Sequence, residues 1–356
     1  MRTLVTAAVC CLLLIYSLDG TARACTSFCL DTPDGPVFGS NLDLFIPGDG
    51  HVIVNRRGIA KENIRQSTNG ETAKWVSEYG SVTFSLAGRG FAWSGMNEAG
   101  LVMTSMELKA SELPEPDERM PFDSGSYIQY VLDTCGSVQE AIQVVSRVRL
   151  VDDGDSPSHF LVADADGHCA AFEYLDGRFV CYTGESLPVK AMSNMSYARA
   201  LAAYKRGGPR WWWSNPGHSA ERFAGAAARM KSYDASRDTS AASYALETLA
   251  YVVSEPNTKW SVVYDIAKRE VWFGSVTSPT VKRLSLHAFD LSCEAPLLML
   301  DVNAALEGNV ERSFTPYDHD VNLKVFRTLC DRQGIEISAE GAVELMRLLE
   351  SFKCAR

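Results

Sequence analysis

Short apolar runs separated by turn residues dominate the chain that follows residue 24. Residues 26–30, 37–44 and 51–54 are three such runs, and segments rich in Pro, Gly and Asp separate them. Runs of this length bounded by turn residues are typical of β-strands. We therefore expect successive strands joined by tight connections. Further runs predict strands over 82–87, 101–106, 160–165, 170–174 and 179–182, and a hairpin over 260–265 and 270–276.

Helical periodicity, with apolar residues three or four positions apart, appears in the middle of the chain and again at its end. Ser137 and Glu140, three residues apart, predict a capping box at the start of one helix. Residues 112–119, rich in Pro and charge, are expected to form a loop. Along the chain, a group of predicted strands is followed by predicted helices and then by further strands. This order favours a single α+β domain with layered sheets. The predicted helices cover residues 124–135, 137–148, 219–233, 241–253 and 339–352.

The first 24 residues have the pattern of a secretory signal peptide. A basic start at Arg2 precedes an apolar stretch over 4–16, and Ala22-Arg23-Ala24 precedes Cys25. The apolar stretch is shorter than the roughly 20 residues that cross a bilayer, and we expect no membrane span elsewhere. We therefore expect residues 1–24 to be removed, Cys25 to begin the mature chain, residues 25–356 to form its domain, and the protein to be secreted or periplasmic.

The amino-acid composition excludes several classes of protein. Of 356 residues, 46% are hydrophobic and 22% charged, enough to bury a sizeable core and too apolar for a disordered chain. The formal net charge of -10 has the wrong sign for a surface that binds nucleic acid, and it repels anionic lipid. We expect a small-molecule partner, and the sequence is compatible with both a monomer and a homo-oligomer.

Eight of the ten cysteines lie in the expected mature chain. There is no C-x-x-C pair and the six histidines lack H-x-x-x-H spacing, so we expect neither a metal centre nor a cofactor. Cys29, four positions after Cys25 on the same strand face, is expected to be a small core residue. Export permits disulfides, and Cys330 with Cys354 is the candidate pair.

A cysteine at a new N-terminus brings a thiol and an α-amine together on one residue. Their ordinary pKa values are about 8.5 and about 7.7 to 8.0, so the amine is able to accept the proton of the thiol near neutral pH. This arrangement replaces the separate base of a Cys-His pair. A carboxylate is then needed to orient the amine, and a carboxamide or backbone N–H to stabilise the oxyanion.

Several segments, in order, carry a resemblance to a known family. Cys25-Thr26-Ser27-Phe28 and 38–43 (F-G-S-N-L-D) resemble the start of the choloylglycine hydrolases, N-terminal nucleophile hydrolases that include bile salt hydrolases and penicillin V acylases. The resemblance spans about 25–277 and leaves 278–356 as a less certain extension. It implies a four-layer αββα sandwich. Further matching segments are 95–101 (G-M-N-E-A-G-L), 160–174, 192–194 (M-S-N), 221–223 (E-R-F) and 258–265.

The resemblance also assigns roles to individual residues. It implies that Cys25 is the nucleophile and, through its amine, the proton shuttle, and that Asp43 holds this amine. It implies that Asn194 donates to the oxyanion and that Arg222 stabilises the thiolate or the polar network around it. The residues alone leave other readings open: a turn or cap for Asp43, a turn or glycosylation acceptor for Asn194, and a surface charge for Arg222.

Two positions depart from the family pattern. Ser40 stands three residues before Asp43, where the family usually has arginine, so one cation near the thiol is missing and we expect its pKa to be less depressed. Glu107 stands where bile salt hydrolases have asparagine and penicillin acylases tyrosine. An ionised carboxylate does not donate to an oxyanion. We therefore expect Glu107 to point elsewhere or to bind a cationic or hydroxyl group of the substrate.

The sequence thus favours an exported amidase that hydrolyses a linear amide C–N bond of an N-acylated small molecule through an acyl-thioester on Cys25. An acyltransferase or a peptidase of the same superfamily is a related alternative. A contrasting alternative is a non-catalytic envelope binding protein that a lipid on Cys25 tethers. The segment 207–214, with three consecutive tryptophans, is either an aromatic surface loop or a mobile apolar wall for a hydrophobic substrate.

Overall fold

Two β-sheets form the centre of the molecule. The computed structural model describes residues 25–67, 69–151, 158–207, 218–238 and 240–355. The first sheet has the order β14 (Ala191–Ser193), β1 (Thr26–Leu30), β2 (Val37–Asp43), β15 (Thr258–Asp265), β16 (Glu270–Ser275), β17 (Lys282–Ser285) and β19 (Gly308–Asn309). The second has the order β13 (Arg178–Thr183), β12 (Cys169–Leu175), β11 (Ser158–Ala163), β8 (Val102–Glu107), β7 (Ser94–Asn97), β6 (Ser81–Ser85), β3 (His51–Asn55), β18 (Leu298–Asp301) and β20 (Thr315–Pro316).

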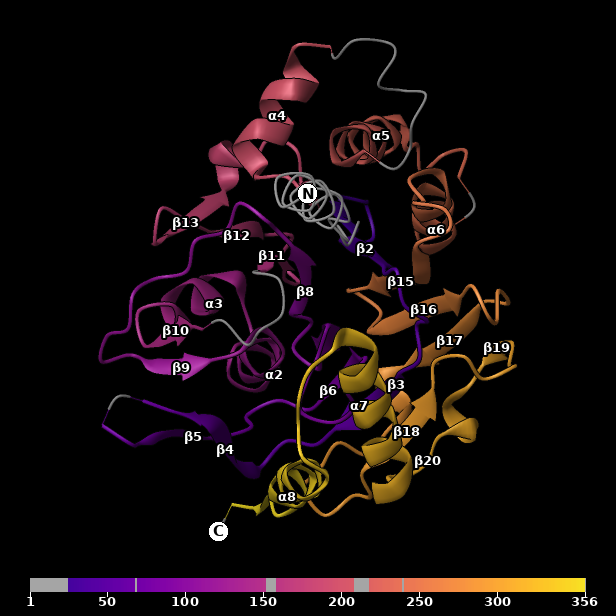
Figure 1. The fold of residues 1–356 in the computed structure, drawn as a ribbon. Helices are drawn as coiled ribbons and strands as arrows, with labels where there is room; N and C mark the ends of the chain where they lie inside the picture. The colour runs from indigo at the N-terminus through magenta and orange to yellow at the C-terminus, as the bar shows by residue number, and fades with distance from the viewer. Residues whose placement is uncertain (1–24, 68, 152–157, 208–217, 239, 356) are drawn as a thin grey trace, which may run out of the picture.

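Helices cover the outer faces of both sheets. On the first sheet, α5 (Ser219–Ser232) and α6 (Ala241–Tyr251) pack against β14, β1, β2 and β15. On the second, α2 (Ser124–Thr134) packs against β7 and β8. Figure 1 shows these helices on opposite sides of the paired sheets. The expected α+β four-layer αββα sandwich is therefore confirmed.

The strands beside the expected nucleophile are buried along their whole length. Every residue of β1 and β2 is buried, because sheet, helices and the facing sheet enclose them. Phe28 pairs directly with Gly39 across the two strands, and a Cβ on Gly39 would lie 2.6 Å from the Phe28 ring. Glycine is therefore required at this point of the F-G-S-N-L-D segment.

Most of the predicted elements are present, with shifts at their ends. The capping box of Ser137 and Glu140 is confirmed at the start of α3 (Val138–Val144). This helix is shorter than expected because 148–150 forms β10 (Val148–Leu150), which pairs with β9 (Met120–Phe122). Not predicted from the sequence pattern were α4 (Tyr197–Lys205), α7 (His319–Gln333) and the hairpin of β4 (Ile59–Gln66) and β5 (Thr72–Val76). Residues 208–214 of the tryptophan segment lie outside the described residues.

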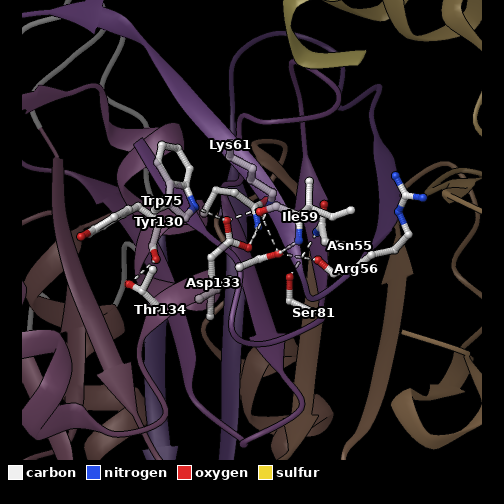
Figure 2. Close-up of polar contacts among 12 residues, drawn as sticks. Asn55, Arg56, Ile59, Lys61, Trp75, Ser81, Tyr130, Asp133 and Thr134 are labelled. Carbon is white, nitrogen blue, oxygen red and sulfur yellow. Dashed lines mark hydrogen bonds and ion pairs between the residues drawn. The ribbon is translucent and has the colours of Figure 1, made fainter. Parts of the chain in front are cut away.

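A buried ion pair fixes the β4–β5 hairpin to α2. Lys61 Nζ lies 2.8 Å from Asp133 Oδ2, and both side chains are largely buried. The carboxylate also accepts hydrogen bonds from Trp75 Nε1 at 2.7 Å and from Gln129 Nε2 at 2.9 Å. Figure 2 shows Lys61 and Trp75 reaching this carboxylate from the hairpin. Because every oxygen of Asp133 has a donor, the buried charge is compensated.

The disulfide joins Cys293 to Cys354, so the expected pairing of Cys330 with Cys354 is wrong. Cys330 lies on the face of α7 that packs against α8 (Ala339–Glu350). Cys354 instead belongs to β21 (Lys353–Cys354), which pairs with β4 opposite Ile59. Because α8 turns back along α7, the end of the chain leads away from Cys330 and into β21, where Cys354 meets Cys293.

No helix among the described residues has both the length and the apolar character that a membrane crossing requires.

Candidate active site

Four segments that are distant in sequence meet at the start of β1. Cys25 directly precedes this strand. The pairing of Thr26 with Asn41 sets the end of β2, and thus Asp43, on one side. The pairing of Thr26 with Ser193 sets the end of β14 on the other side, where Asn194 follows. Helix α5, which packs against both β1 and β14, supplies Arg222. The structure therefore brings together the residues to which the sequence assigned catalytic roles.

Arg222 is the centre of the polar network. It is 2% exposed, which excludes the interpretation of a surface charge. Its Nη1 donates to the backbone oxygen of Cys25 and, at 2.6 Å, to Thr26 Oγ1. Its Nη2 donates to Asn194 Oδ1 at 3.1 Å. Burial lowers the pKa of Arg222, and Asp43 and Cys25 oppose that effect. The guanidinium thus holds the start of β1 and the amide of Asn194 in fixed positions.

Asp43 is fully buried beside this network. Its Oδ2 lies 3.8 Å from Arg222 Nη1, and among the described residues neither carboxylate oxygen accepts a well-formed hydrogen bond. Burial is the main cause that raises its pKa to about 7; Arg222 opposes it, and so does the side chain of Thr258, which pairs with Asp43 from β15 but is not within the geometry of a well-formed hydrogen bond. The Sγ atom of Cys25 lies 4.0 Å from the backbone oxygen of Asp43. Asp43 is therefore a buried carboxyl group close to the thiol that lacks the compensation expected for its charge.

The amide of Asn194 is oriented at both ends. Its Oδ1 accepts from Arg222, and its Nδ2 donates to the backbone oxygen of Glu107 at 2.8 Å. An amide nitrogen has two hydrogens, so one remains to donate elsewhere. Glu107 is the last residue of β8, and it makes this contact through its backbone carbonyl, not through its side chain. The substrate-binding role expected for the Glu107 side chain stays a prediction.

Ser40, which replaces the arginine of the family pattern, lies in a group of hydroxyls between the sheets. Its Oγ is 2.7 Å from Ser27 Oγ and 3.3 Å from Thr104 Oγ1. All three residues are fully buried. Neutral hydroxyls therefore occupy the space where the pattern has a cation, and Arg222 is the guanidinium that contacts Cys25.

A buried pair that the sequence pattern did not predict supports Asn194. Glu173 Oε1 lies 3.2 Å from His159 Nδ1 and accepts a hydrogen bond from the backbone N–H of Tyr197 at 2.7 Å. Tyr197 begins α4, three residues after Asn194. The sequence feature that could have indicated this pair is a histidine and a glutamate within the otherwise apolar strands β11 and β12. Their alignment depends on the register that places Phe160 opposite Phe172, which the sequence does not specify.

Two groups of side chains among the described residues have the spacing of metal ligands, and neither belongs to this site. One contains Cys293 and Cys354, which form the disulfide. The other contains Asp164, Asp166 and His168, just beyond the end of β11 that is remote from Ser158. Exposed acidic groups of this kind are common without an ion.

Comparison with known proteins gives consistent matches. The model of the family described as "linear amide C–N hydrolases, choloylglycine hydrolase family" matches residues 25–205. A penicillin V acylase of Pectobacterium atrosepticum is 28% identical over 206 residues, which are 52% of this chain and 54% of that relative. The match thus spans about half the length of this curated relative.

Solved structures share the fold. The structure of penicillin V acylase from Agrobacterium tumefaciens has a TM-score of 0.71 at 23% identity, and covers 82% of this chain and 98% of its own. A mutant conjugated bile acid hydrolase from Clostridium perfringens has a TM-score of 0.64 at 14% identity, over 78% of this chain and 96% of its own. At these identities the likeness concerns the fold, which is the sandwich of the N-terminal nucleophile hydrolases.

Proposed function

The chain belongs to the choloylglycine hydrolase family of linear amide C–N hydrolases, and from this premise we propose that it hydrolyses the amide bond of an N-acylated small molecule with Cys25 as nucleophile. One observation carries the proposal. Arg222 contacts the backbone of Cys25, the amide of Asn194 and the carboxylate of Asp43 from a single buried position. A nucleophile, an oriented amide donor and a carboxylate within one network are the parts that amide hydrolysis by an N-terminal cysteine requires.

The proposed enzyme becomes active when export removes residues 1–24. Cleavage before Cys25 releases an α-amine, the base that the mechanism needs. Asp43, a buried carboxylate with incomplete compensation, is the proposed partner of the resulting ammonium group. The family match begins at Cys25, which supports this boundary. We place the mature enzyme outside the cytoplasm, secreted or in the periplasm.

The reaction proceeds in two steps. The α-amine accepts the thiol proton, and Sγ attacks the amide carbonyl carbon to form a tetrahedral intermediate. The C–N bond then breaks, the α-ammonium donates the proton to the leaving amine, and an acyl-thioester remains. Water attacks the thioester with the amine again as base, which releases the carboxylic acid and restores the thiol. The remaining Nδ2 hydrogen of Asn194 is the proposed donor to the oxyanion, a contact worth about 2.7 to 4 kcal/mol.

The alternatives concern the acceptor and the fate of Cys25. In an acyltransferase an amine replaces water in the second step, and a peptidase would take a peptide amide. In a lipid-tethered binding protein, a diacylglycerol group on Cys25 would occupy the sulfur that the reaction needs. The names of the relatives point to apolar acyl groups, such as phenoxyacetyl or cholyl, and acyl homoserine lactones are of the same chemical type.

The decisive experiment combines intact mass with turnover. We expect the exported protein to begin at an unmodified Cys25 and to release amine from at least one of penicillin V, glycocholate and an acyl homoserine lactone. Cys25→Ala should lose at least 1,000-fold in kcat/KM, because it removes the nucleophile. Cys29→Ala, which truncates a neighbouring buried cysteine of the same strand, is the matched control and should stay active. An alanine variant at position 25 with an unchanged rate, or a diacylglycerol adduct on the wild type, would contradict the proposal.

A further inference from the structure

A small polar cavity of about 30 Å³ lies between the β4–β5 hairpin, the connection from β6 to β7, and α8. A single water needs about 10–15 Å³, so the cavity has room for about two water-sized groups. That size suits a small inorganic ion and excludes an organic substrate. Lys61 and Trp75, labelled in Figure 2, line the cavity from the hairpin, Arg89 lines it from the connection, Gln129 from α2 and Leu349 from α8.

Arg89 brings a buried positive charge to this cavity. The residue is 8% exposed, and among the described residues its guanidinium makes neither a hydrogen bond nor an ion pair. The guanidinium carbon lies 5.7 Å from the centre of the Tyr317 ring. Burial lowers the pKa of Arg89 to about 10, because it disfavours the charged form. The five N–H groups of the guanidinium are therefore available to a ligand, and a buried charge of this kind favours a negative one.

The backbone that carries Arg89 is fixed against α7. Gly88 has a positive φ of 83°, and a Cβ at this position would lie 2.2 Å from Asn322 Oδ1. The same oxygen accepts a hydrogen bond from the backbone N–H of Arg89 at 2.9 Å. Arg89 is therefore a fixed part of the junction between the second sheet and the C-terminal helical hairpin α7–α8.

The acidic groups that act on Arg89 already have other partners. Glu350 and Asp133 are the carboxylates that stabilise its charge. Glu350 Oε1 accepts a hydrogen bond from the Tyr317 hydroxyl at 2.9 Å. Both oxygens of Asp133 accept from Lys61. Two buried cations, Lys61 and Arg89, thus share one fully buried carboxylate, and one positive charge at the cavity is left uncompensated.

Two other residues of the lining limit what the cavity accepts. Glu62 is partly exposed, and its carboxylate lies 3.7 Å from Lys74 Nζ, so its charge has a partner outside the cavity. Asn63 Oδ1 is buried and accepts no hydrogen bond among the described residues. This oxygen needs a donor, which a water supplies and a monatomic anion does not. The available room therefore suits one anion at Arg89 and one water at Asn63.

We propose that this cavity binds one small inorganic anion, of the size of chloride, on the guanidinium of Arg89. The anion supplies the negative charge that the buried groups lack. Because the cavity lies between the sandwich and α8, the bound anion stabilises the attachment of the α7–α8 hairpin. The site is separate from the candidate active site, and the inference does not depend on the proposed amide hydrolysis.

The first test measures urea unfolding in sodium chloride and in sodium gluconate at equal ionic strength. Gluconate is too large for the cavity. We expect the urea midpoint of the wild type to rise with chloride and to level off as the site fills, whereas Arg89→Met should lose this chloride-specific rise. Arg229→Met is the matched control and should keep it. The Arg229 guanidinium also lies over a tyrosine ring, 4.3 Å from the centre of Tyr244, but it donates to Thr248 and Glu247.

The second test locates the ion directly and decides the matter if Arg89→Met fails to fold. Crystals of the wild type soaked in sodium bromide should show an anomalous peak beside Arg89. No peak there, or a chloride-specific rise that persists in Arg89→Met, would overturn the proposal. A peak without any effect of chloride on the urea midpoint of the wild type would indicate binding at crystal concentration only, and would overturn it as well.

Discussion

Asp43 is held in surroundings that disfavour its negative charge while residue 24 still precedes Cys25. Burial removes the carboxylate from water, and Arg222, at 3.8 Å, compensates it only in part, so its pKa is raised to about 7. An ammonium group released beside it would supply the missing partner. Cleavage before Cys25 would then create the α-amine that acts as the base. It would also stabilise the negative charge of Asp43, which holds that amine in position.

This account gives the unprocessed chain a characteristic pH dependence. The folded-state pKa of Asp43 lies above its unfolded value, so the folded chain binds the additional proton and loses stability as pH rises from about 4 to about 7. Asp43→Asn removes this titration. In a chain that retains Ala24, we expect the variant to exceed the wild type at pH 8 by up to about 4 kcal/mol in free energy of unfolding. Urea unfolding between pH 4 and 8 measures the difference.

The same variant in the processed chain is the control. There the released amine should lower the pKa of Asp43, so the stability gain should shrink while amide turnover is lost. Equal pH dependence of wild type and variant in the unprocessed chain would contradict the assignment of the raised pKa to Asp43.

At the scale of elements, the start of α4 controls the position of Asn194. Glu173 accepts from the first backbone N–H of the helix, at Tyr197, and lies beside His159. A carboxylate at a helix N-terminus satisfies one of the free N–H groups and interacts favourably with the helix dipole. The pair thereby fixes the segment that leads from β14 through Asn194 into the helix.

Replacing Glu173 should therefore affect catalysis from a distance. Glu173→Leu leaves the N–H of Tyr197 and the ring of His159 without their buried acceptor, at a cost of about 1–3 kcal/mol in stability. We expect kcat to fall about tenfold or more with KM nearly unchanged, because Asn194 is proposed to act on the transition state. Glu173→Gln keeps an acceptor oxygen and should retain most of the activity. If the two variants had equal activity, the positioning role would be wrong.

The elements around the site also show how far the sequence alone could lead. Strands β1 and β2 were predictable because Pro- and Gly-rich turns bound short apolar runs, and the family resemblance marked Cys25, Asp43, Asn194 and Arg222. Strand β4 was missed because its sequence, I-A-K-E-N-I-R-Q, lacks an apolar run. Helix α7 was missed although Asp318 caps its start and Gly334, with φ of 68°, ends it.

What the sequence could not provide was register. The juxtaposition of Ser158 with Glu107 and of His159 with Glu173 depends on strand pairings that join distant segments. The raised pKa of Asp43 likewise depends on burial among segments far along the chain, from which Arg222 and Thr258 approach it. The disulfide was wrongly assigned for the same reason, because the direction in which α8 returns along α7 decides which cysteine Cys354 meets.

At the scale of the molecule, the disulfide connects the C-terminal hairpin to the sandwich and closes a segment of 61 residues. Chain-entropy arguments give a crosslink of that span about 4 kcal/mol, by restricting the unfolded chain. Cys354→Ser should therefore lower stability by up to that amount, measured by urea unfolding. Because α7 also packs through Phe326 on Phe91, the hairpin should remain attached but loosen.

The same crosslink should make the stability of the wild type sensitive to reducing agent. Reduction breaks the crosslink without changing the sequence, so the wild type in reducing agent should lose as much stability as Cys354→Ser does. Cys330→Ala, which truncates a buried thiol outside the disulfide, is the matched control. It should cost packing energy but keep the response to reducing agent, because its disulfide is intact, whereas Cys354→Ser should not respond. Equal stability of the wild type before and after complete reduction of the disulfide would contradict this role of the crosslink.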